Sequence, residues 1–359
     1  MKLCYDNIIY YLQNSGGISK YWYELTNRLI TTEDISFIEY DKSCNNFFRN
    51  ELNIPIGSVK YDKVRILKFA RYLPVFNPIE KDCLFHSSYY RVPLDNKVKT
   101  IVTIHDFTYE YFFSGLRKQV HSWQKRKAIK RADRIICISK STKQDLLMFY
   151  PDIDPDSIDV VYNGVNKEFS PISFEKEELK KAFGLNADVE YAVFVGSRSF
   201  YKNYNIAVEA SALAGLGLII VGGGSFSSAE KDLTERYLKG KYLHIDKAVS
   251  TDILNKIYNL SYCLLYPSSY EGFGIPAAEA INAECIPIVL NKSSLPEVVD
   301  DAGLLCDAPT AHCFAEKIGL LADNNNKVQI LSKCHQQRNR FSWDKCCSET
   351  IKSYSRVYL

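Results

Sequence analysis

The sequence has 359 residues, of which 46% are hydrophobic and 24% are charged, a composition typical of a globular protein and not of a disordered chain. This length is too great for one ordinary hydrophobic core and favours two domains. The net charge of +3 is too small to indicate nucleic acid as a partner.

Membrane-spanning and disulfide-rich classes are also disfavoured. No apolar run is long enough to cross a bilayer, and residues 1–17 are too polar and aromatic for a signal peptide. The 11 cysteines are scattered, without a C-x-x-C pair. This argues against a zinc site or a disulfide framework, and it predicts reduced thiols and a cytoplasmic location.

The N-terminal half alternates apolar runs with polar or glycine-containing turns. Residues 2–9 predict a strand, and residues 14–29 predict a glycine turn that leads into an amphipathic helix. Gly16 and Gly17 place the N–H groups of that helix's first turn where they can face a ligand. On these residues alone, an ordinary strand–helix turn is an equally good interpretation.

Two strand–loop units follow at residues 83–93 and 98–112. His105 and Asp106 come directly after the apolar run TIVTI, and therefore lie at the carboxyl end of a strand, where open α/β sheets carry their sites. A histidine there can orient a reacting hydroxyl or steady developing charge. The alternative is a packed histidine beside a helix-capping aspartate. His86, also placed after a strand, is a weaker candidate.

Residues 115–135 predict a strongly basic helix that contains Trp123. A solvated helix face that covers the sheet explains this charge without any partner. The alternative is peripheral contact of residues 117–134 with an anionic membrane surface, near a lipid-linked acceptor.

A domain boundary is expected after the next strand, which ends at Tyr162. Asn163 and Gly164 form a turn signal there. We therefore expect one domain at residues 1–168 and a second at residues 169–340, with a final amphipathic helix at 341–359.

The second half opens with a strand, a glycine loop and a helix at residues 191–211. The loop carries Gly196 and the cations Arg198 and Lys202, and Asn203 is a candidate helix cap. Two cations opposite a helix N-terminus can hold a diphosphate and stabilise the charge on a leaving group. Solvated surface cations are the alternative.

The next units, 215–233 and 241–259, again alternate strand, loop and helix. Ser227 and Glu230 form a capping-box pattern. The run 222–224 fails the dinucleotide fingerprint, because Ser227 stands where that pattern needs glycine, and we interpret these glycines as the wall of a cleft.

A strand, a glycine loop and a helix are also predicted at residues 261–283. Gly272 and Gly274 permit close backbone approach, and the helix N-terminus that follows is suited to an anion. Glu271 and Glu279 flank this loop, so the ligand that fits best carries both a phosphate and hydroxyl groups. The alternative is an ordinary turn, with Glu279 in the first helical turn as a partner of the helix dipole.

The E-x7-E spacing of Glu271 and Glu279 around GFGIP, together with VFVGSRSFYKN at Val193–Asn203, resembles the retaining glycosyltransferases of family 4, which have the GT-B fold. GGISKYWYEL near the N-terminus is similar to a subgroup that contains bacterial O-antigen mannosyltransferases. The resemblance implies an α/β protein with two doubly wound Rossmann-like domains that face a central cleft. The N-terminal domain would bind the acceptor, and the C-terminal domain would bind the nucleotide sugar. One departure is Glu284–Cys285, where family members commonly have Cys-Gly.

The resemblance also implies roles for single residues. Glu279 would hold the ribose hydroxyls, Arg198 and Lys202 the diphosphate, and Glu271 with the following amides the sugar ring, while His105 would lie on the acceptor side. The implied catalytic residues are His105, Glu271, Arg198 and Lys202. The implied donor-binding residues are Gly16, Gly17, Gly196, Asn203, Ala248, Val249, Gly272, Phe273, Gly274, Ile275 and Glu279.

The activity implied is retaining transfer of a hexose, with mannose from GDP-mannose preferred, to a glycan or lipid-linked acceptor in the synthesis of a cell-surface polysaccharide. We expect no metal and no cofactor, because no D-x-D motif stands at a strand end. The location expected is the cytoplasm, with a peripheral position on the inner face of the membrane as an option. Alternatives are a UDP-sugar-dependent hexosyl- or N-acetylhexosaminyltransferase, a GT-B epimerase or phosphorylase, and a non-catalytic nucleotide-sugar binder.

Overall fold

The computed structural model describes residues 1–62, 64, 70–247 and 249–358. The chain forms two compact units, Met1–Gly164 with Trp343–Leu359, and Val165–Ser342. The chain thus changes unit after Gly164 and after Ser342, whereas the sequence placed these boundaries after residues 168 and 340. Val165 pairs with Ser342 in a parallel bridge at the point where the chain enters and leaves the second unit.

The first unit is built on a seven-stranded parallel sheet with the order β3-β2-β1-β4-β5-β6-β7. Its strands are mostly buried, which explains why they appear in the sequence as short apolar runs. The order reverses between β1 and β4. The strands are β1 (Lys2–Asp6), β2 (Asp34–Glu39), β3 (Val59–Tyr61), β4 (Leu84–Ser87), β5 (Lys99–Ile104), β6 (Arg134–Cys137) and β7 (Ile158–Val160).

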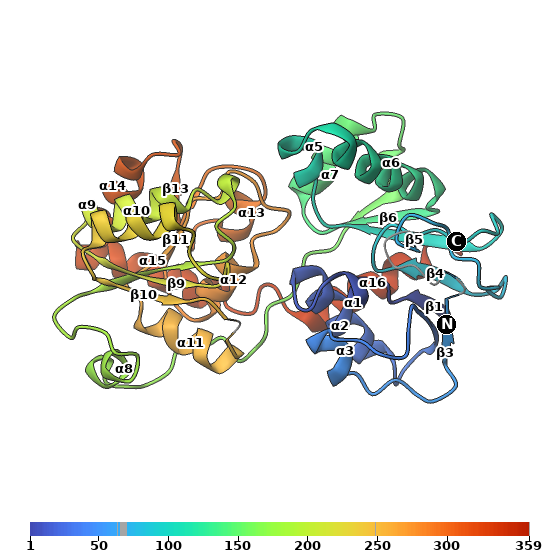
Figure 1. The fold of residues 1–359 in the computed structure, drawn as a ribbon, viewed down its shortest axis with the longest axis horizontal. Coiled ribbons are helices and arrows are strands. Elements are labelled where there is room, and N and C mark those ends of the chain that lie inside the picture. Colours follow the sequence, from blue (N-terminus) through green and yellow to red (C-terminus); the bar gives the residue numbers. More distant parts are fainter. Residues whose placement is uncertain (63, 65–69, 248, 359) are drawn as a thin grey trace. The chain divides into compact units, whose positions relative to one another are not determined.

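Helices cover both faces of this sheet (Figure 1). One group consists of α1, α2, α3 and the C-terminal α16, and the other of α5, α6 and α7. The helices are α1 (Ile9–Leu12), α2 (Gly17–Leu29), α3 (Phe47–Glu51), α5 (Thr108–Phe112), α6 (Gly115–Arg131), α7 (Lys140–Phe149) and α16 (Trp343–Ser355), with a 3-10 turn η1 (Pro155–Ser157).

The C-terminal helix α16 is fixed to the first unit by a buried polar chain. The Tyr354 hydroxyl lies 2.7 Å from the Tyr5 hydroxyl and 2.7 Å from Nδ1 of His86. The other ring nitrogen of His86 lies 3.0 Å from Oγ1 of Thr103. His86 is inside β4 and fully buried, so its assignment to a strand end as a site candidate was wrong.

The second unit has a six-stranded parallel sheet with the order β10-β9-β8-β11-β12-β13. Numbered within the unit, this is the 3-2-1-4-5-6 order of doubly wound dinucleotide-binding folds, and the order reverses between β8 and β11. The strands are β8 (Tyr191–Val195), β9 (Gly217–Val221), β10 (Tyr242–Ile245), β11 (Leu264–Tyr266), β12 (Pro287–Leu290) and β13 (Leu304–Cys306).

Helices lie on both faces of this sheet as well. Helices α9, α10 and α14 pack together on one face, and α8 and α11 lie on the other (Figure 1). The helices are α8 (Lys176–Ala182), α9 (Tyr204–Leu213), α10 (Ser228–Leu238), α11 (Thr251–Leu260), α12 (Ile275–Asn282), α13 (Leu295–Val299), α14 (Ala311–Leu320) and α15 (Asn324–Gln337), with a 3-10 turn η2 (Phe200–Lys202).

Local sequence signals explain where two of these helices begin. Ser227 and Glu230 form the predicted capping box at the start of α10, with each side chain bonded to the backbone N–H of the other residue. Pro276 occupies the first turn of α12, where its missing N–H costs nothing. Asn203 does stand at the N-cap of α9, but its side chain makes no capping bond, so the predicted cap was wrong.

All 11 cysteines are unpaired, and nine of them are buried. Burial raises the pKa of thiols such as Cys263 to about 12, which keeps them protonated and unreactive. Among the helices described, none is long and apolar enough to cross a membrane.

Candidate active site

The glycine loop and the cation loop meet where the strand order of the second unit reverses. Strand β8 ends at Val195 and leads into the loop 196–203, and β11 ends at Tyr266 and leads into the loop 267–274. Because β8 and β11 are parallel neighbours, both loops lie at the carboxyl edge of the sheet. A doubly wound sheet binds its ligand at this reversal point.

An ion pair joins the two loops. The Lys202 ammonium contacts the Glu271 carboxylate and donates a hydrogen bond of 3.2 Å to the Tyr266 hydroxyl. Both charged side chains are nearly buried, at 12% and 13% exposure. Burial and the Glu271 charge hold the pKa of Tyr266 well above its usual value, so this hydroxyl stays protonated. An ammonium has three N–H donors, and these contacts use two of them.

The same two loops are also tied through Asn203. Its side-chain amide donates to the Pro267 carbonyl and to the Ser269 hydroxyl, at 2.8 Å each. The Ser269 amide donates to the Tyr201 carbonyl at 2.8 Å. Asn203 adopts a left-handed conformation with φ of 51°, which asparagine tolerates better than most residues. The side-chain amide of Asn203, which was expected to cap α9, therefore holds together the two loops that carry Lys202 and Glu271.

The glycine loop is held in place from the opposite side by two serines. Ser293 accepts a hydrogen bond of 2.9 Å from the Glu271 amide. The buried Ser294 hydroxyl lies 2.9 Å from the carbonyls of Glu271 and of Phe273. Gly274 has φ of 99°, a value that side chains rarely adopt, and it turns the chain into α12. These contacts and the positive φ of Gly274 together define the shape of the loop.

Glu279 lies one turn deeper than predicted. Helix α12 begins at Ile275 and has no acidic residue in its first turn, so the assignment of Glu279 to that turn was wrong. Its carboxylate is buried and accepts a hydrogen bond of 3.2 Å from the Tyr258 hydroxyl on α11. A carboxylate accepts hydrogen bonds through two oxygens, so this group suits a ligand that presents hydroxyl groups.

Arg198 has a different environment from Lys202. Its side chain is 3% exposed, and Nε donates to Glu230 at 2.9 Å. Nη1 donates to the Gly222 carbonyl at 2.8 Å, and Nη2 donates to the carbonyls of Gly224 and Ser225 at 2.9 Å each. The guanidinium therefore supports the loop 222–225 and has no described contact with Lys202 or Glu271.

Three consecutive glycines allow the loop 222–225 to wrap around this guanidinium. Gly222, Gly223 and Gly224 all have positive φ, at 90°, 81° and 73°. A Cβ on Gly223 would lie 2.6 Å from Nη1 of Arg198, so a side chain at this position would displace the guanidinium. Gly196, with φ of 132°, begins the neighbouring loop.

Sequence reasoning missed an aromatic pair beside Arg198. The rings of Phe226 and His244 stack with centroids 3.7 Å apart, and the Arg198 guanidinium lies 4.8 Å from the Phe226 centroid. Tyr266, Ser293 and Ser294 were also missed. Of these, only Tyr266 could have been found from the sequence, because it ends the strand that precedes the glycine loop. The two serines follow β12, and their contacts with the glycine loop depend on the pairing of β12 with β11.

In the first unit, His105 follows β5 as predicted from its strand-end position. It is 8% exposed, and its ring meets the Tyr21 ring edge-on at 5.0 Å between centroids. Burial lowers the pKa of His105 to about 4, with Lys125 acting in the same direction and Asp106 against it. The imidazole is therefore neutral at neutral pH. Asp106 accepts a hydrogen bond from the Thr108 amide, but it is not the helix cap that the alternative expected, because the N-cap of α5 is Phe107.

The other predicted donor residues are distributed as follows. Gly16 and Gly17 stand at the N-terminus of α2, and a Cβ on Gly17 would meet no neighbouring atom, so the backbone is open on that side. Val249 follows β10, beside the start of α11. Ala248 lies outside the described residues.

One group of side chains in the described ranges has the spacing of a metal site, namely Glu80, Asp82 and Cys83. The Lys2 ammonium lies 2.7 Å from Asp82 and 3.4 Å from Glu80. These residues precede β4, and so lie at the amino edge of their sheet, away from the strand ends where the predicted site residues lie. The position is occupied by a cationic side chain and offers no support for catalysis.

Two family models match the chain. Residues 15–169 match the family described as Glycosyltransferase Family 4, and residues 175–338 match the family described as Glycosyl transferases group 1. The two matches follow one another and correspond closely to the two structural units.

Relatives and solved structures agree with these matches. The chain is 25% identical to the O-antigen chain mannosyltransferase B of Escherichia coli, over 94% of the chain and 95% of the relative. It is 28% identical to the O-antigen chain mannosyltransferase RfbU of Salmonella typhimurium, over 56% and 55% of the two chains. The fold is similar to that of Anabaena HepE in complex with UDP and glucose, with a TM-score of 0.73, 15% identity and 99% coverage of both chains.

Proposed function

Because this chain is a GT-B glycosyltransferase of family 4, we propose that it transfers a hexose and retains the configuration at the anomeric carbon. The donor that we propose is GDP-mannose, so the transferred hexose would be mannose. The observation that carries the proposal is the joining of Lys202 and Glu271 at the strand-order reversal of the second unit. Mannose is preferred because the mannosyltransferase B relative aligns with nearly the whole chain.

In this proposal Lys202 supplies the direct cationic contact to the donor diphosphate. Glu271 binds hydroxyls of the transferred sugar together with the amides of Gly272–Ile275, and Glu279 binds the ribose hydroxyls. Arg198, whose donors hold the loop 222–225, adds positive charge at the same edge of the sheet. Together these groups stabilise the nucleoside diphosphate as it leaves, which is the main electrostatic demand of the reaction.

We assign the acceptor to the first unit, with a neutral His105 available to orient the acceptor hydroxyl or to accept a hydrogen bond from it. The proposed acceptor is a glycan, free or linked to a lipid, in the synthesis of a cell-surface polysaccharide. This implies a cytoplasmic enzyme at the inner face of the membrane. The two O-antigen mannosyltransferase relatives support this assignment.

We propose further that no metal takes part in donor binding, because Lys202 and Arg198 supply cationic charge at the reversal point. The test is a thermal-shift screen of GDP, UDP and their sugars with a chelator present. The expected result is stabilisation by GDP and GDP-mannose, and dependence of that stabilisation on added magnesium would contradict the proposal.

Transfer is tested by mass spectrometry of reactions that contain GDP-mannose and a mannose-containing oligosaccharide. Appearance of a product one hexose heavier, with the α-anomer observed by NMR, supports retaining transfer. Conversion of the donor without an acceptor would indicate an epimerase instead. Donor binding with no consumption by any acceptor or by water would indicate a binding protein.

A UDP-sugar donor is the second candidate. HepE, whose fold this chain shares, has been solved with UDP and glucose. In that case UDP and UDP-glucose or UDP-N-acetylhexosamine would give the larger thermal shift, and the roles proposed for Lys202 and Glu271 would be unchanged.

A further inference from the structure

We propose that Lys125 is a positioning residue for the acceptor side of the reaction, because its buried ammonium holds the turn that carries His105 and sets the charge that this imidazole faces. The inference rests on the proposed function, in which His105 meets the acceptor hydroxyl, and it concerns the first unit alone. It gives Lys125 a task that differs from that of the exposed cations on the same helix.

Lys125 is buried although it belongs to the strongly basic helix α6. Its side chain is 0% exposed and that of Glu110 is 4% exposed, with 2.8 Å between Nζ and Oε2. By contrast, Lys130 of the same helix is 45% exposed and pairs with an exposed aspartate. Fully buried lysines are rare, because removing an ammonium from water is costly. A buried ion pair gives little net stability compared with an apolar pair, so stability alone does not explain Lys125.

The contacts of the Lys125 ammonium converge on the turn after β5. Nζ donates a hydrogen bond of 2.8 Å to the Asp106 carbonyl and another of 2.8 Å to Glu110 on α5. The Phe107 ring centroid lies 4.4 Å from Nζ, so an aromatic face also meets the ammonium. An ammonium has three N–H donors, and these three groups surround it. Because His105 directly precedes Asp106, Lys125 fixes the backbone next to the imidazole.

Helix α6 holds α5 through two further side chains. The Lys118 ammonium donates a hydrogen bond of 2.7 Å to the Glu110 carbonyl, and the Ser122 hydroxyl donates one of 2.9 Å to Oε1 of Glu110. Lys118, Ser122 and Lys125 follow one another at spacings of four and three residues, so they share one side of α6. Helices α5 and α6 pack against each other (Figure 1). The turn that carries His105 is thus held between β5 and this pair of helices.

The neighbouring strand end carries a strained residue. Tyr90, in the loop after β4, has φ of 53°, a left-handed value that bulky side chains rarely adopt. Its ring centroid lies 5.7 Å from Nζ of Lys125 and 5.8 Å from the ring centroid of His121, which is one turn earlier on α6. Backbone strain persists where the surrounding contacts impose it, and it concentrates at functional sites. The packing around Lys125 therefore extends to the carboxyl ends of both β4 and β5.

Lys125 also sets the charge that His105 faces. Burial lowers the pKa of His105, Asp106 raises it, and Lys125 lowers it. On the remaining sides are the Tyr21 ring of α2, 5.0 Å away between centroids, and His86 of β4, which is neutral because burial lowers its pKa to about 3. An apolar side chain at position 125 would leave the Asp106 charge unopposed. The imidazole would then take up a proton more readily and lose the lone pair that accepts a hydrogen bond from a hydroxyl.

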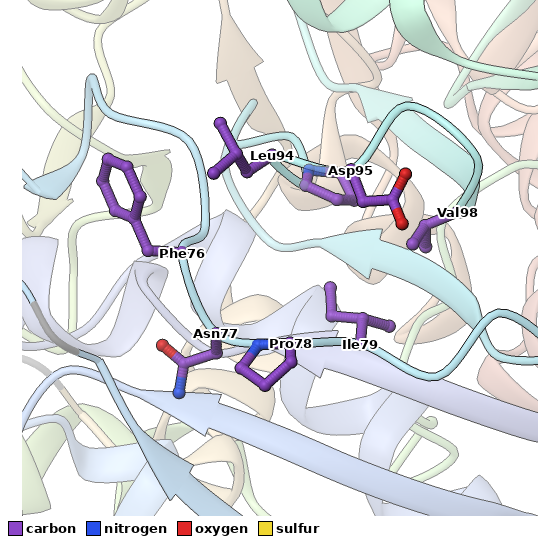
Figure 2. A pocket seen from close by; sticks show the side chains of 8 residues that line it. Phe76, Asn77, Pro78, Ile79, Leu94, Asp95 and Val98 are labelled. Atoms are coloured by element: carbon purple, nitrogen blue, oxygen red, sulfur yellow. The ribbon is translucent and has the colours of Figure 1, made fainter.

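The pocket shown in Figure 2 is separate from this network. It has a volume of about 380 Å³, and its apolar lining includes Phe76, Ile79 and Leu94. Val98, which also lines it, directly precedes β5, whereas His105 directly follows that strand of six residues. Six strand residues span roughly 20 Å. The pocket therefore lies near the opposite end of β5 and offers His105 no contact.

A matched pair of variants separates the ammonium from the ion pair. Glu110→Gln breaks the ion pair but keeps the Lys125 ammonium. Lys125→Met combined with Glu110→Gln also removes the ammonium, without leaving a carboxylate buried alone. Replacing both partners of a buried pair costs little, so this double variant should fold, which urea denaturation checks. Lys130→Met removes an exposed lysine of the same helix and is the control.

NMR of the chain with ¹³C-labelled histidine measures the protonation of His105, whose resonance is assigned from His105→Gln. From about pH 5 to about pH 8 this resonance should stay nearly constant in the parent chain, Glu110→Gln and Lys130→Met, because the pKa of His105 is about 4. In the double variant its midpoint should rise by roughly one pH unit, the usual effect of a nearby charge. An unchanged titration in the folded double variant would overturn the proposal. Loss of folding in the double variant but not in Glu110→Gln would assign the ammonium to stability and overturn it as well.

Transfer kinetics provide the second readout. With GDP-mannose and a mannose-containing oligosaccharide, the double variant should lose at least about tenfold in kcat/KM for the acceptor, because the imidazole is misplaced and charged. The GDP-induced thermal shift should be unchanged, since the proposed diphosphate contacts lie in the second unit. Parallel losses of GDP binding and transfer would contradict the role of Lys125. A parent chain that transfers to no acceptor would instead contradict the proposed function, while the NMR titration, which needs neither donor nor acceptor, still tests Lys125.

Discussion

Lys202 and Glu271 neutralise each other across the two loops, so an arriving diphosphate must compete for an ammonium that is already partly bonded. Lys202→Ala should therefore weaken GDP binding by about 1.5–3 kcal/mol, the value of a hydrogen bond to a charged group. Isothermal titration calorimetry measures this change. Lys256→Ala, which removes an exposed lysine of the same unit, is the control and should bind GDP normally. Equal affinities of the Lys202 variant and the parent chain would remove Lys202 from the site.

Arg198 differs because its donors satisfy backbone carbonyls of the loop 222–225. Arg198→Ala should lower the free energy of unfolding of the ligand-free chain by about 1–3 kcal/mol, because the carbonyls of the loop 222–225 and the Glu230 carboxylate lose a partner. It should also abolish most of the GDP-induced thermal shift. Arg198→Lys should rescue little, since an ammonium cannot span the carbonyls as a guanidinium does. Urea denaturation and thermal shift measure the two effects; normal stability with lost binding would indicate direct phosphate contact instead.

At the scale of elements, the start of α12 depends on the shape of its glycine loop. Gly274 has φ of 99°, and a Cβ there would also lie 2.7 Å from Cδ2 of Leu295. Gly274→Ala should destabilise the second unit by about 1–3 kcal/mol and weaken donor binding. Gly319→Ala on α14 is the matched control; its Cβ meets no atom, and helix propensity predicts a gain of up to about 1 kcal/mol. Equal stability of the two variants in urea would contradict this interpretation.

Several features of these elements could be predicted because their causes are local. The capping box of Ser227 and Glu230 and the proline in the first turn of α12 depend on residues a few positions apart. The positions of Lys202 and Glu271 on glycine loops at strand ends could be predicted for the same reason.

The remaining features depend on contacts that short sequence patterns do not encode. Asn203 binds a loop more than sixty residues away in sequence, and Arg198 is surrounded by a glycine loop that follows β9. His86 is inside the core because Tyr354, from the far end of the chain, lies against it. Glu279 was predicted to lie in the first turn of its helix. The structure places it in the second turn, because α12 already begins at Ile275.

At the scale of the whole molecule, buried histidines make stability depend on pH. Burial lowers the pKa of His86 and His121 to about 3 and of His105 to about 4. Each stays neutral in the folded chain but takes up a proton in the unfolded chain below its ordinary pKa of 6.5. The free energy of unfolding should therefore fall as pH decreases below about 6.5, by up to about 1.4 kcal/mol per pH unit for each histidine.

Urea denaturation at a series of pH values checks this dependence. His86→Gln should reduce the slope below pH 6.5, whatever its effect on stability at neutral pH. The parent chain, which keeps His86, is the reference and should show the full slope. A slope that is the same in the variant and the parent chain would contradict the assignment of the pH dependence to the buried imidazoles.

The account rests on a nucleoside diphosphate binding at the point where the sheet order of the second unit reverses. A crystal structure of the chain soaked with GDP-mannose, with chelator in place of metal, tests this most directly. The account predicts that the diphosphate lies within hydrogen-bond distance of Nζ of Lys202 and beside the 271–275 loop, with the ribose hydroxyls at Glu279. Electron density for the diphosphate at any other edge of the sheet, or in the first unit, would contradict it.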